Sequence, residues 1–162
     1  MKPRRIPGPL VADLIATAEL LAASPGQPTF RQACMRRAVS GAYDAVFHAP
    51  CATFSDALVG WSKASILAPI YRSLDHGPVL KKLRSREARQ IDERIERVAF
   101  LFGSLQEQRH AADYAPPSPL FSRTQTLTLV ADAQEAVSLS SGLEAPKRLQ
   151  LAILPIARQR AA

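Results

Sequence analysis

Residues 91–114 read IDERIERVAFLFGSLQEQRHAADY, and this stretch decides the fold. Its apolar residues recur at spacings of four, three, four and three, which is the seam of a long amphipathic helix with one buried face. The next two positions on this line are charged, and two prolines then end the helix. The seam consists of Ile91, Ile95, Val98, Phe102 and Leu105, followed by Arg109 and Asp113 and then by Pro116 and Pro117.

Arg109 and Asp113 therefore fall on a line that faces the core. Charged side chains in such a place must be paired, hydrated or bound to a ligand. Two interpretations are open. The pair forms a structural salt bridge near the helix end, or it marks a polar cleft between helices that binds a ligand.

Most of the remaining chain also shows helical spacing, and only a short Thr-Leu-Thr-Leu at 126–129 alternates like a strand. The sequence predicts an all-α fold, an antiparallel bundle of four to five helices over 8–144, with an apolar and basic tail at 145–162 that folds back or packs on a partner. Helices are expected over 10–23, 30–48, 61–74, 86–114 and 122–140. A break or kink is expected at Pro69, a loop with a short helix at 51–60, and a stop before Pro50.

Capping patterns support two of these boundaries. Thr29 with Gln32 has the form of a capping box at the second helix. Ser122 with Gln125 has the same form at the last bundle helix, and Gly142 is placed to end that helix.

The composition indicates a basic globular protein whose cysteines are reduced. The 162 residues carry a formal charge of +7, which favours anionic partners such as nucleic acid or nucleotides. Cys34 and Cys51 are expected to be reduced packing residues. The start Met1–Arg5 imitates a signal peptide, but the acidic residues Asp13 and Glu19 interrupt the apolar run that follows, so a cytoplasmic protein without a membrane span is expected.

The second helix carries an unusual polar stripe. On a helical wheel, Asp44 and His48 lie one turn apart, so the carboxylate can orient or charge the imidazole. Gly41 costs helix stability, which is explained if a helix or a ligand approaches the backbone there. The alternative is a solvated face on which the glycine has no such role. The apolar strip is Met35, Val39, Ala42 and Val46, and the stripe on the opposite side is Arg37, Gly41, Asp44 and His48.

Two further features are candidates for function. His76, before Gly77 and Pro78, either caps a helix end or belongs to a site. A basic cluster, Lys81, Lys82, Arg84, Arg86 and Arg89, either contacts phosphates or forms an ordinary exposed face, and the charges at Asp92, Glu93 and Glu96 are expected to be solvated. The sequence has no phosphate-binding glycine loop, zinc spacing or nucleophile motif, so no metal and no cofactor are predicted.

The segment Arg37-Ala-Val-Ser-Gly-Ala-Tyr43-Asp44-Ala-Val-Phe-His48 resembles the second-helix signature of the HEPN superfamily of helical bundles. Asp75-His76-Gly77 is similar to the histidine-containing turn of these proteins, and Arg109-x-x-Ala-Asp113-Tyr114 to their late-helix signature. The resemblance spans roughly residues 10–140. Gly41 stands where the family usually has a basic residue, and Asp44 where it has a second tyrosine.

The resemblance implies an all-α, often dimeric bundle that works around nucleotides or RNA, frequently beside a nucleotidyltransferase-type partner in prokaryotic defence or toxin–antitoxin systems. Members that cleave RNA place a histidine after an arginine on one helix, with four to six residues between them, and none of the three histidines here has that spacing. Binding is therefore expected rather than cleavage. By matching position, the resemblance implies a set of ligand-binding residues: Arg37, Tyr43, His48, His76, Arg109, Asp113 and Tyr114. Asp44, on the same stripe of the second helix, is added to this set.

Two alternatives stay open. In a divergent, metal-independent endoribonuclease toxin, His48 is the general base and Arg37 or Arg109 stabilises the phosphate. In a structural module, the polar stripe and the tail form a dimer interface.

Overall fold

The computed structural model describes residues 8–157, so the basic start Met1–Arg5 and residues 158–162 of the predicted tail lie outside the described residues. All regular elements within this range are helices, which confirms the all-α prediction, and the Thr-Leu-Thr-Leu stretch is helical. The helices are α1 (Gly8–Ala22), α2 (Pro28–Val59), α3 (Ala64–Ser73), α4 (His76–Leu83), α5 (Arg86–Ile91), α6 (Arg94–Tyr114), α7 (Arg123–Ser141) and α8 (Ala145–Ile153).

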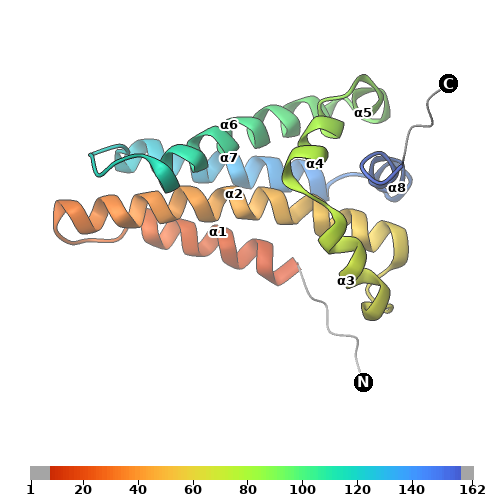
Figure 1. Ribbon diagram of the computed structural model, residues 1–162, viewed down its shortest axis with the longest axis horizontal. Coiled ribbons are helices and arrows are strands. Elements are labelled where there is room, and N and C mark those ends of the chain that lie inside the picture. Colours follow the sequence, from red (N-terminus) through yellow and green to blue (C-terminus); the bar gives the residue numbers. More distant parts are fainter. Residues whose placement is uncertain (1–7, 158–162) are drawn as a thin grey trace.

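Helix α2 lies at the centre of the molecule. It packs against α1, α6, α7 and α8, and Figure 1 shows α1, α2, α6 and α7 side by side with the shorter helices gathered toward one end. Small residues such as Ala38, Ala42 and Ala45 are fully buried on α2, and their short side chains allow neighbouring helices to approach closely. The central helix therefore positions side chains against several neighbours at once.

The predicted end of this helix before Pro50 is wrong, because α2 continues through Pro50 to Val59. A proline inside a helix removes one backbone hydrogen bond. Here the flanking residues Cys51 and Phe54 are buried in the core, so packing compensates for that loss. The expected loop at 51–60 is instead the last part of α2, and Gly60 ends it with φ of +75°.

The predicted single helix over 86–114 is also wrong, because Asp92 divides it into α5 and α6. Asp92 has an extended backbone, and its carboxylate accepts hydrogen bonds from the backbone N–H and the guanidinium of Arg94 and from Lys147 of α8. An aspartate that bonds nearby backbone competes with helix formation. The side chain of Asp92 is only 4% exposed, so its predicted solvated position is a further error.

The short helices α3 and α4 contain the prolines that were expected to interrupt the chain. Helix α3 runs through Pro69 without a break. Gly77 and Pro78 lie in the first turn of α4, where the missing proline N–H has no helical acceptor to lose, and His76 begins that helix rather than ending one.

One of the two predicted capping pairs is correct. The Ser122 hydroxyl accepts a hydrogen bond from the Gln125 N–H at 3.1 Å, and Gly142 ends α7. At α2 the N-cap is Gln27, without a side-chain cap, so the Thr29–Gln32 box is wrong. The Gln32 amide instead exchanges two hydrogen bonds of 2.8 Å with the backbone of Phe121.

The tail folds back onto the rest of the molecule. Helix α8 packs on α2 and α5, and Leu151 and Ala152 are buried. None of the described helices combines the length and the hydropathy needed to cross a bilayer.

Gly41 faces α1, but α1 does not approach closely enough to require a glycine there, so the explanation by a close approach of a helix is wrong. A Cβ atom there would lie 3.9 Å from the Ala18 Cβ and from the Leu14 carbonyl oxygen, which is ordinary contact.

We therefore expect Gly41→Ala to stabilise the protein by about 0.5–1 kcal/mol, since alanine favours the helix and fits the space. Urea denaturation measures this change. Gly60→Ala is the matched control and should destabilise by about 1 kcal/mol, because its φ is positive; a destabilising Gly41→Ala would contradict the account.

Candidate functional site

Asp113 of α6 binds three side chains, of which Arg37 and Ser40 belong to α2 and Arg109 to α6. Its carboxylate accepts hydrogen bonds from Arg109 Nε at 2.7 Å, Arg37 Nη2 at 2.6 Å and Ser40 Oγ at 2.5 Å. The side chain of Asp113 is 13% exposed, against 37% for Arg109 and 62% for Arg37. One carboxylate thus fixes two guanidinium groups. The Arg109–Asp113 pair is a salt bridge near the helix end, and Arg109 also lines a cleft.

Aromatic rings lie beneath Arg109. Its Cζ atom is 5.7 Å from the centroid of the buried Tyr43 ring, and the Tyr43 hydroxyl is hydrogen-bonded to His76 Nδ1. The His76 ring in turn stacks on Phe47, with centroids 3.6 Å apart and an interplanar angle of 11°. This arrangement brings α2, α4 and α6 together around one position.

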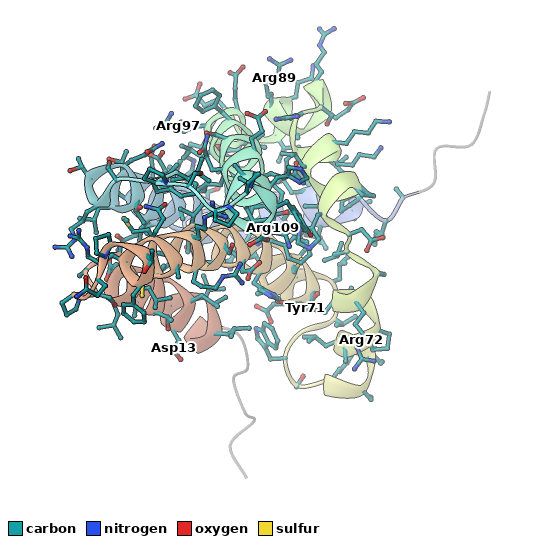
Figure 2. All side chains as sticks on the ribbon, turned by 60° about the vertical axis from the view of Figure 1, so that its left-hand side comes forward. Asp13, Tyr71, Arg72, Arg89, Arg97 and Arg109 are labelled. Carbon is teal, nitrogen blue, oxygen red and sulfur yellow. The ribbon has the colours of Figure 1, made fainter. Side chains whose placement is uncertain are left out.

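A cleft of about 600 Å³ opens at this position, which is within the range of small-molecule sites. Tyr43, His76 and Arg109 all line this cleft. Figure 2 labels Arg109 near the middle of the molecule. The other lining residues are Gln106, Glu107 and His110. The cleft therefore combines one guanidinium, one carboxylate and flat rings.

The titratable groups of the site are shifted mainly by burial. Burial lowers the pKa of His76, and the nearby charge of Arg109 acts in the same direction. Burial raises the pKa of Tyr43, and it raises the pKa of Asp44 although the charges of His48 and Arg109 oppose that shift. At neutral pH, His76 and Tyr43 are therefore uncharged and act as hydrogen-bonding rings.

His48 lies next to the cleft but does not line it. Its Nδ1 atom is hydrogen-bonded to the Tyr71 hydroxyl, and burial lowers the His48 pKa while the charge of Asp44 opposes that shift. Burial also raises the pKa of Tyr71. His48 and Tyr71 thus tie α2 to α3 beside the site.

Most of the predicted ligand-binding residues therefore lie together: Arg37, Tyr43, Asp44, His48, His76, Arg109 and Asp113. Tyr114 is different, because it is 65% exposed and packs only on His110 among the described aromatic residues. The sequence did not indicate Gln106, Glu107 and His110, although each is within one turn of Arg109. Tyr71 was also missed, and its place in the Tyr71–Gly77 segment near His76 was the available signal.

The basic cluster lies apart from the cleft, on α4, α5 and the turn between them. The Arg89 guanidinium pairs with Glu96 at 3.2 Å, and the Arg84 guanidinium lies against Gly103 of α6. The remaining members are Lys81, Lys82 and Arg86, and none of the five lines the cleft.

The described residues contain no group of three or more side chains that could hold a metal ion. Both cysteines are buried, and burial raises the pKa of Cys51 to about 12, which keeps its thiol protonated. These thiols pack in the core, as the sequence indicated.

Comparison of the chain with family models, curated proteins and solved structures gives no match. The function of the site must therefore be argued from its geometry. Its chemistry is that of a mixed polar cleft, in which a fixed cation faces neutral rings and one carboxylate.

Proposed function

We propose that the protein binds a phosphate-bearing ribonucleotide, either free or as part of an RNA, in the cleft lined by Tyr43, His76 and Arg109. One observation carries the proposal: Asp113 fixes Arg109 beside the rings of the cleft, yet the Arg109 side chain remains 37% exposed. A fixed, accessible guanidinium is well suited to a phosphate, which it meets with two hydrogen bonds.

The other cleft residues fit the remaining parts of a nucleotide. Glu107 supplies a carboxylate that can accept hydrogen bonds from ribose hydroxyls, a use that acidic residues have in dinucleotide sites. Neutral His76 is exposed and offers ring surface and a hydrogen bond to a base, while the buried Tyr43 holds the His76 ring in place. A simple anion would gain nothing from Glu107, whereas a ribonucleotide uses both charges.

The resemblance to the HEPN superfamily supports this proposal as an analogy. The residues that carry the resemblance come from α2, α4 and α6, and they meet around Tyr43 and Arg109. On this basis we also propose a four- to five-helix bundle of HEPN type, a homodimer, and a nucleotidyltransferase-type partner in a prokaryotic defence or toxin–antitoxin system. Light scattering of the purified chain tests the dimer, and a monomeric mass would contradict it.

A binding experiment tests the function. We expect adenosine monophosphate or a short unstructured RNA to bind at moderate salt, measured by calorimetry and fluorescence anisotropy. Arg109→Gln should weaken binding about tenfold, because a charge-assisted hydrogen bond to phosphate is lost. Its stability should change by less than about 1 kcal/mol, since Arg37 still pairs with Asp113.

Arg72→Gln is the matched control. Arg72 is exposed on α3 and carries the same charge, so this variant should bind like the wild type. Absence of any affinity in the wild type, or equal losses in the two variants, would refute the proposal.

Ribonuclease activity is the second candidate, and one observation favours it. A histidine with a lowered pKa, His76, lines the cleft beside Arg109, so it could take the proton of a ribose 2′-hydroxyl while the guanidinium stabilises the phosphate. His48, the base expected from the sequence, is bound to Tyr71 outside the lining. Electrophoresis of the RNA recovered from the binding experiment distinguishes cleavage from binding alone. Shorter RNA after incubation with the wild type, but not with His76→Ala, would establish cleavage.

A further inference from the structure

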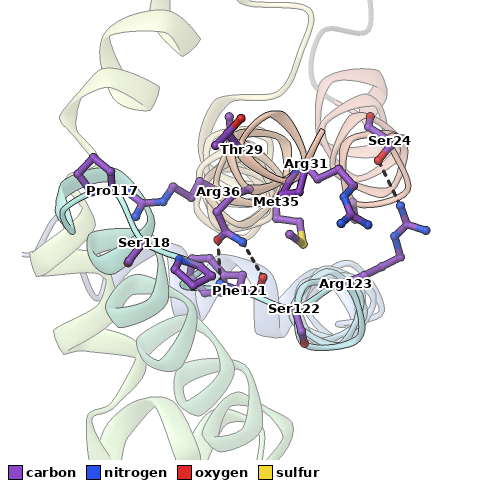
Figure 3. A pocket seen from close by; sticks show the side chains of 15 residues that line it. Ser24, Thr29, Arg31, Met35, Arg36, Pro117, Ser118, Phe121, Ser122 and Arg123 are labelled. Atoms are coloured by element: carbon purple, nitrogen blue, oxygen red, sulfur yellow. Dashed lines mark hydrogen bonds between the residues drawn. The ribbon is translucent and has the colours of Figure 1, made fainter. Parts of the chain in front are cut away.

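A second cavity, of about 770 Å³, opens where the connection between α1 and α2 meets the connection between α6 and α7 (Figure 3). It shares no lining residue with the Tyr43 cleft. Its volume also falls in the range of small-molecule sites. The cavity is therefore a separate candidate for ligand binding.

One part of its wall is apolar and held in place. Met35 and Phe121 line the cavity, together with Pro117 and Pro119. Phe121 is 4% exposed, and its backbone is held by the two hydrogen bonds of the Gln32 amide. The apolar surface is thus formed before any ligand arrives.

The charged residues of the lining are all cationic. Arg31, Arg36 and Arg123 are the only charged members among the fifteen lining residues, and none of these residues is acidic. Arg36 donates to the carbonyl oxygens of Ala115 and Pro116, both at 2.7 Å. Carbonyl oxygens accept hydrogen bonds but do not neutralise the charge.

Arg123 is held in the same way, by the carbonyl oxygens of Ala23 and Ser24 at 3.3 and 3.2 Å. Arg31 makes no side-chain hydrogen bond to any part of the chain that the structure describes, and none of the three arginines forms an ion pair within residues 8–157. Figure 3 shows Arg31 and Arg123 extending toward the end of α1. Three positive charges thus surround an apolar cavity without a carboxylate among them.

We propose that this cavity binds a small amphipathic anion, with a carboxylate or phosphate head on Arg31 and Arg123 and an apolar body on Met35, Pro117 and Pro119. Charge complementarity selects the head, since only an anion offsets the uncompensated guanidinium charge. The apolar wall selects the body, because a fully hydrophilic anion would leave that surface in water. This proposal does not rest on the proposed nucleotide function, because the two sites share no lining residue.

The probe is 8-anilinonaphthalene-1-sulfonate, an aromatic anion whose fluorescence rises in apolar sites. We expect the full-length protein to bind it at one site, and we expect decanoate and decyl phosphate to displace it. The relative affinities of these two ligands show whether a carboxylate or a phosphate head is preferred. Decanamide, the neutral counterpart, should compete roughly threefold to fivefold more weakly than decanoate, because it lacks the charge.

Two variants locate the site. Arg31→Gln should weaken decanoate binding by a similar roughly threefold to fivefold factor, and the fold should be unaffected since this side chain is exposed. Ser118→Trp, at an exposed lining position, should block the cavity and abolish binding. Arg72→Gln is the charge-matched control, and Arg109→Gln should keep full decanoate affinity even if the nucleotide proposal fails.

Equal affinity for decanoate and decanamide would overturn the proposal, and so would unchanged binding in both Arg31→Gln and Ser118→Trp. Displacement by a pentaglutamate peptide but not by decanoate would also overturn it, because the occupant would then be an acidic protein segment. Circular dichroism of each variant verifies that the probe reports on folded protein.

Discussion

Replacing Asp113 with alanine should destabilise the protein by about 2 kcal/mol and weaken nucleotide binding by up to about tenfold, because Arg109 then loses the partner that fixes it. The carboxylate accepts hydrogen bonds from Arg37, Ser40 and Arg109, and its side chain is only 13% exposed. Its loss leaves two guanidinium groups near each other without a counter-charge. The exposed fractions of Arg37 and Arg109, 62% and 37%, keep the expected cost below that of a fully buried ion pair.

Urea denaturation and the nucleotide titration measure the two effects. Asp113→Asn keeps one acceptor oxygen and the shape of the side chain, so it should lose less stability than Asp113→Ala. Asp13→Ala removes an exposed carboxylate from α1 and should leave both readouts unchanged. If Asp113→Ala unfolds at the same urea concentration as the wild type, the carboxylate does not hold α2 and α6 together.

Replacing Asp92 with alanine should have the largest effect on stability, about 3 kcal/mol. Its carboxylate is 4% exposed and accepts hydrogen bonds from Arg94 at 2.8 and 2.9 Å and from Lys147 Nζ at 3.0 Å. These bonds hold the junction of α5 and α6 to α8. The variant should therefore lower the free energy of unfolding and loosen this junction, while the packing of α8 on α2 remains.

The stabilising effect of Asp92 should depend on pH. The hydrogen bonds from Arg94 hold the Asp92 pKa well below its ordinary value of 3.8. A carboxyl group with a lowered pKa in the folded state contributes stability above its unfolded pKa, and that contribution is lost as the pH falls below about 4. The stability difference between wild type and Asp92→Ala should be full at pH 7 and shrink in this acidic range, as urea titrations at several pH values would measure. Glu93→Ala, a change at the exposed neighbouring carboxylate, should show no comparable difference.

Spacing along the chain was sufficient to predict the all-α fold and most helix positions. The predicted seam residues of α6, Ile95, Val98, Phe102 and Leu105, are buried, although the buried face is wider and also includes Ala99, Leu101, Gly103 and Ala112. Spacing failed where a tertiary contact outweighed a local signal. Pro50 stays inside α2 because the surrounding core packs on the helix. Asp92 breaks a strong helical pattern because its carboxylate binds both the nearby Arg94 N–H and Lys147, which is distant in sequence.

The candidate site could be predicted in part. The charges on the seam and the stripe of the second helix indicated Arg109, Asp113 and Arg37, which the structure brings together. Periodicity identifies the face of a helix but not the element that meets it. The sequence therefore could not show that His76 of α4 is hydrogen-bonded to Tyr43, or that Tyr71 of α3 is hydrogen-bonded to His48.

Arg36 and Arg37 are adjacent in sequence, yet they bind two different parts of the C-terminal end of α6. Arg36 bonds the carbonyl oxygens that follow the helix, and Arg37 bonds Asp113 in its last turn. Arg36 lines the second cavity, and the Asp113 network borders the first cleft. A single turn of α2 thus contributes contacts to both sites. A rotation of that turn would therefore change the shape of the cavity and of the cleft together.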